Sequence, residues 1–457
     1  MPATIKVPQN FGAFERSLAA GVLFYGAVVF CLPVEIGWPF VSEDVVFPWW
    51  ATKIGIGNVL LHELLFFVWI ALYGWRFVLR ALLNRGVPTR QAALWLIALA
   101  LWCGVISLAS PLPLQDLGRT FRLLFYAAQL FAVVRWTRQT GNFPLAMLVL
   151  GFFTGTVINL VISIQNPFIV NGAMRLFGQN TPGVAMGIAI HLSAWLFFRT
   201  RHGVVQIFAV IATLVFALGC GMSYSRIGWF AGALGVVAWA YILIAARPRE
   251  REERLLLKKT RRVWVPLLAL GLAALLTSPI VLESLQLIET LIQQKASGEE
   301  YGDVGRAAYV EGVAEILLKY PLGVGYSGFL DAMTRTEVYH SGRANEEDSL
   351  EANPHAAFLW YASAGGIPGG VMAIAVFLML LNSMRFGLLS AMGRPGLILF
   401  VLAAFPFLLI GLTVTYLLNS IILIVPAAIA AGWGWTRWAD GAEKTNSGST
   451  YTAVALR

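Results

Sequence analysis

Long apolar runs recur along almost the whole chain, and they constrain its fold more than any other feature. About twelve of them can be drawn, each close to the roughly 20 residues that a helix needs to cross a bilayer. Hydrophobic residues make up 58% of the sequence and charged residues only 12%, whereas about a quarter of a soluble domain is charged. The sequence therefore predicts an all-α polytopic membrane protein and excludes an ordinary soluble domain.

One long polar segment interrupts these runs and divides the chain. The runs lie at about residues 17–33, 55–79, 91–110, 119–137, 143–164, 183–199, 203–221, 227–246, 263–282, 356–381, 396–412 and 415–435. We predict nine spans in 1–282, a large outer loop with amphipathic helices at 283–355, three spans in 356–437, and a disordered tail at 438–457. The last two runs also allow one bent re-entrant segment, because only a very short turn separates them. No small-residue cleavage site follows the first run, so we expect an uncleaved first span.

The basic residues predict an orientation. Most of the 33 Lys and Arg residues fall in loops on one side of the predicted spans, including the block at 247–262. Cytoplasmic loops carry such an excess, so both termini are expected in the cytoplasm and the 283–355 loop in the periplasm of a Gram-negative inner membrane. The net charge of +9 then indicates contact with membrane lipids and not with nucleic acid. Three cysteines without paired or metal-ligand spacing predict no disulfide framework.

A few outer arginines have no topological explanation. A guanidinium at a helix mouth needs water, a carboxylate or a phosphate, and its fork suits phosphate oxygens. Ser225 and Arg226 open a predicted helix, so a hydroxyl, a guanidinium and free backbone N–H groups form a natural anion site there. Snorkelling to lipid headgroups is the alternative for each arginine, and it suits Arg119 and Arg122 best. The residues concerned are Arg119, Arg122, Arg175, Arg226 and Arg306.

The outer loop contains one amphipathic helix and ends at a histidine. Apolar residues at 309, 310, 313, 316 and 317 form one stripe of a helix that starts near Arg306 and stops at the Tyr-Pro-Leu-Gly-Val-Gly sequence of residues 320–325. His355 stands where the loop meets the next span, with water access and a pKa that suits a general base, although a structural histidine is the alternative. Asn353 is a supporting candidate. The acidic cluster at 346–351 favours a solvated surface over a divalent-metal site.

Together these motifs resemble the O-antigen ligase superfamily, which includes O-antigen polymerases and protein O-oligosaccharyltransferases. The resemblance covers about residues 175–370. In that family the histidine is followed by Asn, Ser or Gln, then nine residues, a Gly, two residues and a Gly or similar residue. Here His355, Gly366 and Gly369 keep the spacing, while Ala356 replaces the amide or hydroxyl residue. The family's Arg with Leu four residues later is represented by Arg226 and Phe230, and the phenyl ring is expected to pack in place of Leu.

The resemblance implies a fold like that of the GT-C glycosyltransferases and a metal-independent, cofactor-free transfer with inversion. A glycan would pass from an undecaprenyl-diphosphate donor to a lipid A-core acceptor. His355 would accept the proton of the acceptor hydroxyl or orient it. Diphosphate binding would fall to Arg226, Arg306 and Arg175, with Ser225, Arg119, Arg122 and Asn353 in support. An O-antigen polymerase, a protein O-oligosaccharyltransferase and a lipid-linked sugar transporter remain alternatives, and the sequence predicts no oligomeric state.

Overall fold

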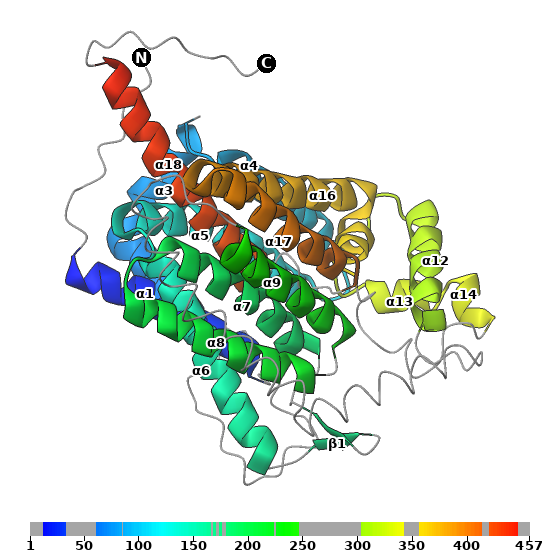
Figure 1. Ribbon diagram of the computed structural model, residues 1–457. Helices are drawn as coiled ribbons and strands as arrows, with labels where there is room; N and C mark the ends of the chain where they lie inside the picture. Colours follow the sequence, from blue (N-terminus) through cyan, green and yellow to red (C-terminus); the bar gives the residue numbers. More distant parts are fainter. Residues whose placement is uncertain are drawn as a thin grey trace.

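A computed structural model describes the chain at residues 12–32, 61–84, 86–165, 168–170, 173–175, 180–223, 225–245, 303–341, 356–413 and 420–446. Helices dominate these ranges (Figure 1). They are α1 (Ala13–Cys31), α2 (Leu61–Trp69), η2 (Ile70–Gly74), α3 (Trp75–Leu83), α4 (Arg90–Ser107), α5 (Pro113–Thr140), α6 (Phe143–Gln165), α7 (Asn180–Arg199), α8 (Gly203–Met222), α9 (Arg226–Ile244), α12 (Asp303–Lys319), α13 (Phe329–Met333), α14 (Glu337–His340), α16 (Ala357–Met392), α17 (Arg394–Thr413), η3 (Ser420–Ile424) and α18 (Val425–Asn446).

The prediction of a helical, polytopic membrane protein is confirmed, while the resemblance to a GT-C fold stays a prediction. Ten helices of the described residues are long and apolar enough to cross a membrane, and Ile421–Trp435 is a shorter apolar helix. Together they account for every predicted run except 263–282, which lies outside the described residues. The last two runs form separate helices, α17 and α18. Of these, α17 is both long and apolar enough to span, whereas the apolar stretch Ile421–Trp435 of η3 and α18 is shorter.

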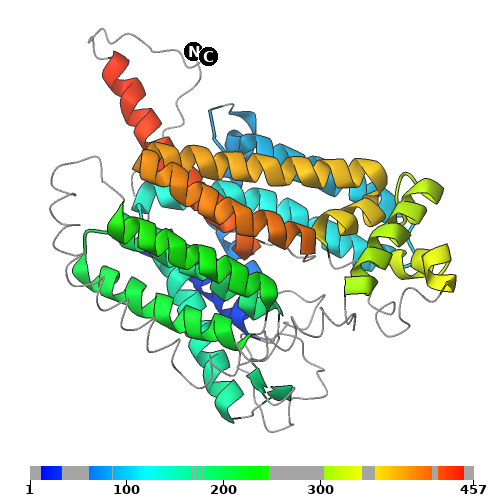
Figure 2. The same ribbon diagram turned by 45° about the vertical axis from the view of Figure 1, so that its right-hand side comes forward.

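The bundle has two distinct ends, and every second connection between spans lies at the same end. At one end, which we call the inner end, the Asn142 side chain donates to the Arg199 carbonyl at 2.9 Å. The Trp433 indole donates to the Gly141 carbonyl there at 3.3 Å. Helices α12–α14 lie at the opposite, outer end (Figures 1 and 2). The side-to-side alternation of the spans is therefore consistent with the contacts between them.

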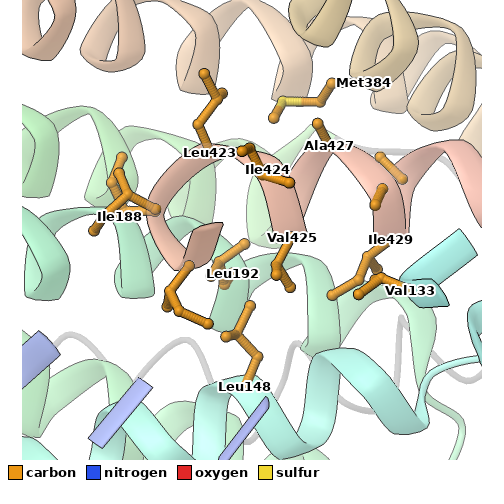
Figure 3. Packing of buried hydrophobic residues seen from close by; sticks show 14 of the residues in the cluster. Val133, Leu148, Ile188, Leu192, Met384, Leu423, Ile424, Val425, Ala427 and Ile429 are labelled. Carbon is orange, nitrogen blue, oxygen red and sulfur yellow. The ribbon is translucent and has the colours of Figure 1, made fainter. Parts of the chain in front are cut away.

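The centre of the bundle is the shorter apolar helix. Residues 421–435 are all buried, as expected for a helix that is apolar on every side. Figure 3 shows η3 and α18 enclosed by neighbouring helices, with Leu423, Ile424, Val425, Ala427 and Ile429 among Met384 of α16, Ile188 and Leu192 of α7, Leu148 of α6 and Val133 of α5. Protein and not lipid surrounds this helix.

The fold is not entirely helical, which corrects the all-α prediction in one detail. Strands β1 (Phe168–Val170) and β2 (Ala173–Arg175) pair antiparallel, with Phe168 opposite Arg175. The two residues between them are Asn-Gly, the pair most typical of a two-residue hairpin turn. That signal was present in the sequence and predicts the hairpin.

The end of α18 corrects a second expectation. The helix continues to Asn446, so it extends into the 438–457 segment that was predicted to be a disordered tail. Ala442, Glu443 and Lys444 are good helix formers, and no proline follows Pro426 to stop the helix. Residues 447–457 lie outside the described part of the chain.

Candidate active site

The outer helices form a small hydrophobic core of their own. The predicted amphipathic helix and its stop before Pro321 are confirmed, because α12 ends at Lys319. Val310 was predicted in the apolar stripe, yet it lies at the edge of the helix face and is 53% exposed. The buried cluster consists of Ala308, Tyr309, Val313, Ile316, Phe329, Ala332, Met333 and Val338, and Leu359 and Trp360 of α16 pack against it. The outer helices are thus seated on the start of α16.

Helix α16 is broken by a kink. Gly366 has φ 67° and ψ −164°, a conformation that is essentially restricted to glycine. The kink separates a short first segment, residues 357–365, from a long second segment, and Pro368 is tolerated because it falls in the first turn after the break. A Cβ on Gly369 would lie 2.5 Å from the Tyr361 carbonyl oxygen. Both glycines of the motif are therefore required by the backbone.

The turn at residues 320–327 docks directly on this kink. Gly323, with φ 101°, approaches so closely that its Cβ would lie 2.5 Å from the Ala364 carbonyl oxygen. A Cβ on Gly366 would in turn meet the backbone of residues 321–323. Three backbone hydrogen bonds of 3.0 Å close the contact, from Val324 N to Ser363 O, from Gly325 N to Ala364 O and from Ile367 N to Pro321 O. The two glycine motifs of the sequence are thus partners in one structural joint.

A buried carboxylate ties the same turn to α5. Asp116 is fully buried, and its Oδ2 accepts hydrogen bonds from the backbone N–H of Ser327 at 3.0 Å and from the Ser327 hydroxyl at 2.9 Å. The Leu112 N–H donates to the same hydroxyl oxygen at 3.1 Å. Sequence reasoning missed Asp116, although an acidic residue in the first turn of a span is a recognisable helix-start signal. The turn is therefore fixed to two spans, α5 and α16.

Arg119 lies beside this joint. Its Nη1 is 4.0 Å from Asp116 Oδ1, and 36% of its side chain is exposed. Its guanidinium carbon is 5.6 Å from the centroid of the Trp360 ring and 6.0 Å from that of Tyr326. The structure therefore brings Arg119 to the first segment of α16. Its contact there, Trp360, follows His355 by five residues in the sequence.

Tyr326 is the buried member of this group. Burial, reinforced by the neighbouring Cys103 thiol, raises the pKa of Tyr326 well above its usual value. The phenol therefore stays protonated at neutral pH, beside the Cys103 thiol of α4. Its ring centroid is 5.4 Å from that of Trp360, so Tyr326 packs as a neutral aromatic side chain against the first segment of α16.

Arg122 lies one turn further along α5 and has a different partner. Its Nε is 3.5 Å from Oε1 of Glu63, which is largely buried in α2. The ion pair joins α5 to α2. Arg119, in contrast, lies over the Trp360 ring of α16. The two arginines, paired by spacing in the sequence, therefore have separate settings.

Ser225 caps a helix. It is the N-cap of α9, its hydroxyl accepts the Gly228 N–H at 3.2 Å, and only 1% of the residue is exposed. A Cβ on Gly228 would lie 2.6 Å from the Gly183 carbonyl carbon, so the first turns of α7 and α9 touch backbone to backbone. Two helix N-termini, each with positive partial charge, thus lie side by side at the outer end.

The other predicted site residues are only partly placed. Arg226 begins α9, Arg306 is in the first turn of α12 and Arg175 ends β2, while the positions of their side chains lie outside the described structure. His355 and Asn353 lie outside the described residues, as does the acidic cluster at 346–351. The roles predicted for these residues stay predictions.

Two departures from the family motif find a structural setting. Ala356 is the N-cap of α16 and makes no side-chain cap hydrogen bond. Asn and Ser, which the family carries at this position, are preferred N-caps, so the substitution removes a helix cap. Phe230 replaces the family's Leu, and its ring lies 5.7 Å from that of Phe405 in α17. Phe230 therefore packs against α17 on one side, while 37% of the residue is exposed.

The comparison with curated proteins gave no match. A family model described as O-antigen ligase matches residues 211–374. The matched segment contains α9, the outer helices, the 320–327 turn and the kink of α16, but not Arg119, Arg122 or Arg175. The resemblance predicted from the motifs is confirmed over this segment, and the match supports the assignment of the chain to the O-antigen ligase family.

Proposed function

We propose that the chain is an inverting glycosyltransferase that transfers an O-antigen glycan en bloc from undecaprenyl diphosphate to lipid A-core. The observation that carries the proposal is the joint between the 320–327 turn and the Gly366 kink, which lies inside the matched segment. This joint fixes the start of α16 at the outer end of the bundle. His355 precedes that helix by two residues, and a general base needs such a fixed support.

The chemistry assigns different work to the histidine and the arginines. Departure of the carrier diphosphate places negative charge on phosphate oxygens, so guanidinium groups stabilise the transition state more than the ground state. Arg226, Arg306 and Arg175 are proposed for this task. The adjoining N-termini of α7 and α9 support an anion at the same end of the bundle. His355 is proposed to take the proton from, or to orient, the acceptor hydroxyl.

Purified protein tests the reaction directly. Carrier-linked glycan and lipid A-core are mixed with the wild type, with His355→Ala and with His340→Ala, a matched control because His340 is exposed on α14. We expect product from the wild type and from His340→Ala, and none from His355→Ala, with donor binding retained. Arg226→Ala and Arg306→Ala are expected to weaken donor binding as well as transfer. Tight donor binding by both would contradict the diphosphate assignment.

An O-antigen polymerase is the second candidate, because the family match does not separate ligation from polymerisation. A deletion strain distinguishes them. Loss of all long chains from lipid A with carrier-linked polymer retained identifies a ligase, whereas lipopolysaccharide with a single repeat identifies a polymerase. Failure of purified protein to form any product favours a transporter. Full activity in EDTA supports metal-independent transfer, and loss of activity that Mg²⁺ restores contradicts it.

The orientation is part of the proposal. We place the inner end in the cytoplasm of a Gram-negative cell and the outer end in the periplasm, on the basis of the Lys and Arg distribution. The three native cysteines are buried, so single introduced cysteines can be labelled above a low background. A membrane-impermeant maleimide added to cells with a permeabilised outer membrane should label Ser341→Cys and not Gly86→Cys. The reverse pattern would invert the topology.

A further inference from the structure

Two aromatic rings hold the plane of the Arg119 guanidinium, while the N–H groups at its rim stay available. Trp360 and Tyr326 lie 5.6 and 6.0 Å from its guanidinium carbon, within the range of a cation–π contact. Such contacts engage the guanidinium but leave N–H groups at its rim. Among the described residues these N–H groups make no hydrogen bond, and a third of the side chain is exposed. Arg119 thus presents donors at the outer end without the entropy cost of ordering a loose side chain.

Asp116 orients this arginine without neutralising it closely. Both hydrogen bonds from Ser327 go to Oδ2, whereas Oδ1 has no hydrogen-bond partner in the described part of the chain. Arg119 approaches Oδ1 only to 4.0 Å, the outer limit of an ion pair. A bidentate Arg–carboxylate pair would instead have contacts near 2.8 Å. The guanidinium therefore keeps donor capacity for a second anion.

The residues around Arg119 suit the binding of an anion that is carried by a lipid. Leu112 and Leu114, at the start of the same helix, are 55% and 87% exposed. They give the start of this spanning helix, one to two turns before Arg119, an apolar surface at the outer end. A ligand that carries a phosphate on a hydrocarbon anchor matches both surfaces at once, because its anchor contacts the leucines and its phosphate oxygen meets the guanidinium.

We propose that Arg119 binds a phosphate oxygen of a lipid-linked substrate, and that Asp116 is its positioning residue. The proposal rests on the proposed function for the identity of the substrates, the carrier diphosphate of the donor or a phosphate of the lipid A-core acceptor. It adds a site on α5, outside the segment that the family model matches. The 320–327 turn would then support the phosphate site, because Ser327, Asp116 and Arg119 link the turn to the bound phosphate.

The experiment measures transfer kinetics with each substrate varied in turn. Wild type is compared with Arg119→Gln, Arg119→Lys and Arg335→Gln. Arg335 is a matched control, because it is also an outer arginine, and it pairs with Asp331 on the exposed surface of α13. We expect Arg119→Gln to raise the KM of one substrate about tenfold to a hundredfold, the loss typical of one charged hydrogen bond. Arg119→Lys should give an intermediate value, and Arg335→Gln should match the wild type.

The substrate whose KM rises identifies the phosphate that Arg119 binds. A raised KM for the donor alone assigns the diphosphate, and a raised KM for the acceptor alone assigns the lipid A-core phosphate. Unchanged KM values for both substrates in a folded Arg119→Gln protein overturn the proposal. So does a variant whose only change is a lost dependence of thermal stability on anionic phospholipid, since Arg119 would then be a headgroup anchor. Folding is checked by thermal unfolding, and Arg119→Lys keeps the test open if the Gln variant does not fold.

Binding measurements separate this proposal from the proposed function. Undecaprenyl diphosphate and lipid A-core are titrated separately onto the full chain in nanodiscs. If the wild type transfers nothing but binds one of these lipids more tightly than Arg119→Gln does, the ligase assignment fails and the Arg119 site stands. Equal binding of both lipids by wild type and variant overturns the site. Asp116→Asn should weaken binding of the same lipid as Arg119→Gln. If Asp116→Asn instead changes the affinity for the other lipid, Asp116 is not the positioning residue of Arg119.

Discussion

The joint between the 320–327 turn and the α16 kink makes a quantitative prediction for Gly366→Ala. Alanine at φ 67° and ψ −164° brings backbone strain of about 1–3 kcal/mol. Its Cβ would also meet the backbone of residues 321–323, where no flexible side chain can move aside. Separating the turn loses the three backbone hydrogen bonds of the joint, each worth about 0.5–1.5 kcal/mol. We therefore expect the turn to be destabilised by roughly 3–7 kcal/mol.

Gly393→Ala is the matched control. Gly393 has φ 68° and ψ −142°, yet a Cβ there would have no neighbour within 4 Å. This variant has similar backbone strain without loss of docking, so the difference between the two variants measures the joint. Trypsin cleavage after the exposed Lys319 reports opening of the turn. A difference of about 3 kcal/mol corresponds to roughly a hundredfold faster cleavage in Gly366→Ala, and equal rates would refute the reasoning.

Two further predictions concern the same outer region. Ala356→Ser restores a side-chain cap at the start of α16 and should stabilise the protein by about 0.5–1 kcal/mol, seen as a higher unfolding temperature than that of the control Ala356→Val; no gain would mean that the Ser hydroxyl does not reach the free N–H groups of α16. Because the pKa of Tyr326 is raised in the folded protein, its contribution to stability is complete below its unfolded pKa of about 10 and is lost as pH rises through the folded value. Tyr326→Phe should therefore lose less stability than the wild type between pH 9 and pH 12 in chemical unfolding, and identical pH profiles would contradict this.

Local features of the structure could be predicted from the sequence. The apolar runs predicted the spans, and Pro321 predicted the end of α12, because hydrophobic periodicity and helix breakers act over a few residues. The helix start at Arg226 followed from the Ser225 cap signal in the same way. The match of the family model bears out the motif at His355, Gly366 and Gly369 as a family resemblance.

Contacts between distant residues could not be predicted. Asp116 and Ser327 are separated by 211 residues, and nothing in either local sequence names the other. The glycines at 323 and 366 were recognised as motif positions, but their mutual contact depends on how α12 and α16 pack. For the same reason Arg119 and Arg122 were grouped by helical spacing, although tertiary packing gives one of them Trp360 and the other Glu63.

The burial of α18 has a consequence for how the protein is made. This helix is the last of the described helices to leave the ribosome, yet it occupies the middle of the finished bundle. The space that α18 occupies between α5, α6, α7 and α16 therefore cannot be filled by protein until residue 435 has been synthesised. The side chains of Val133, Leu148 and Met384 line the space that α18 later occupies. Lipid tails are as apolar as these side chains, so bilayer lipid can fill that space during insertion. The arrival of α18 then displaces that lipid from the middle of the bundle.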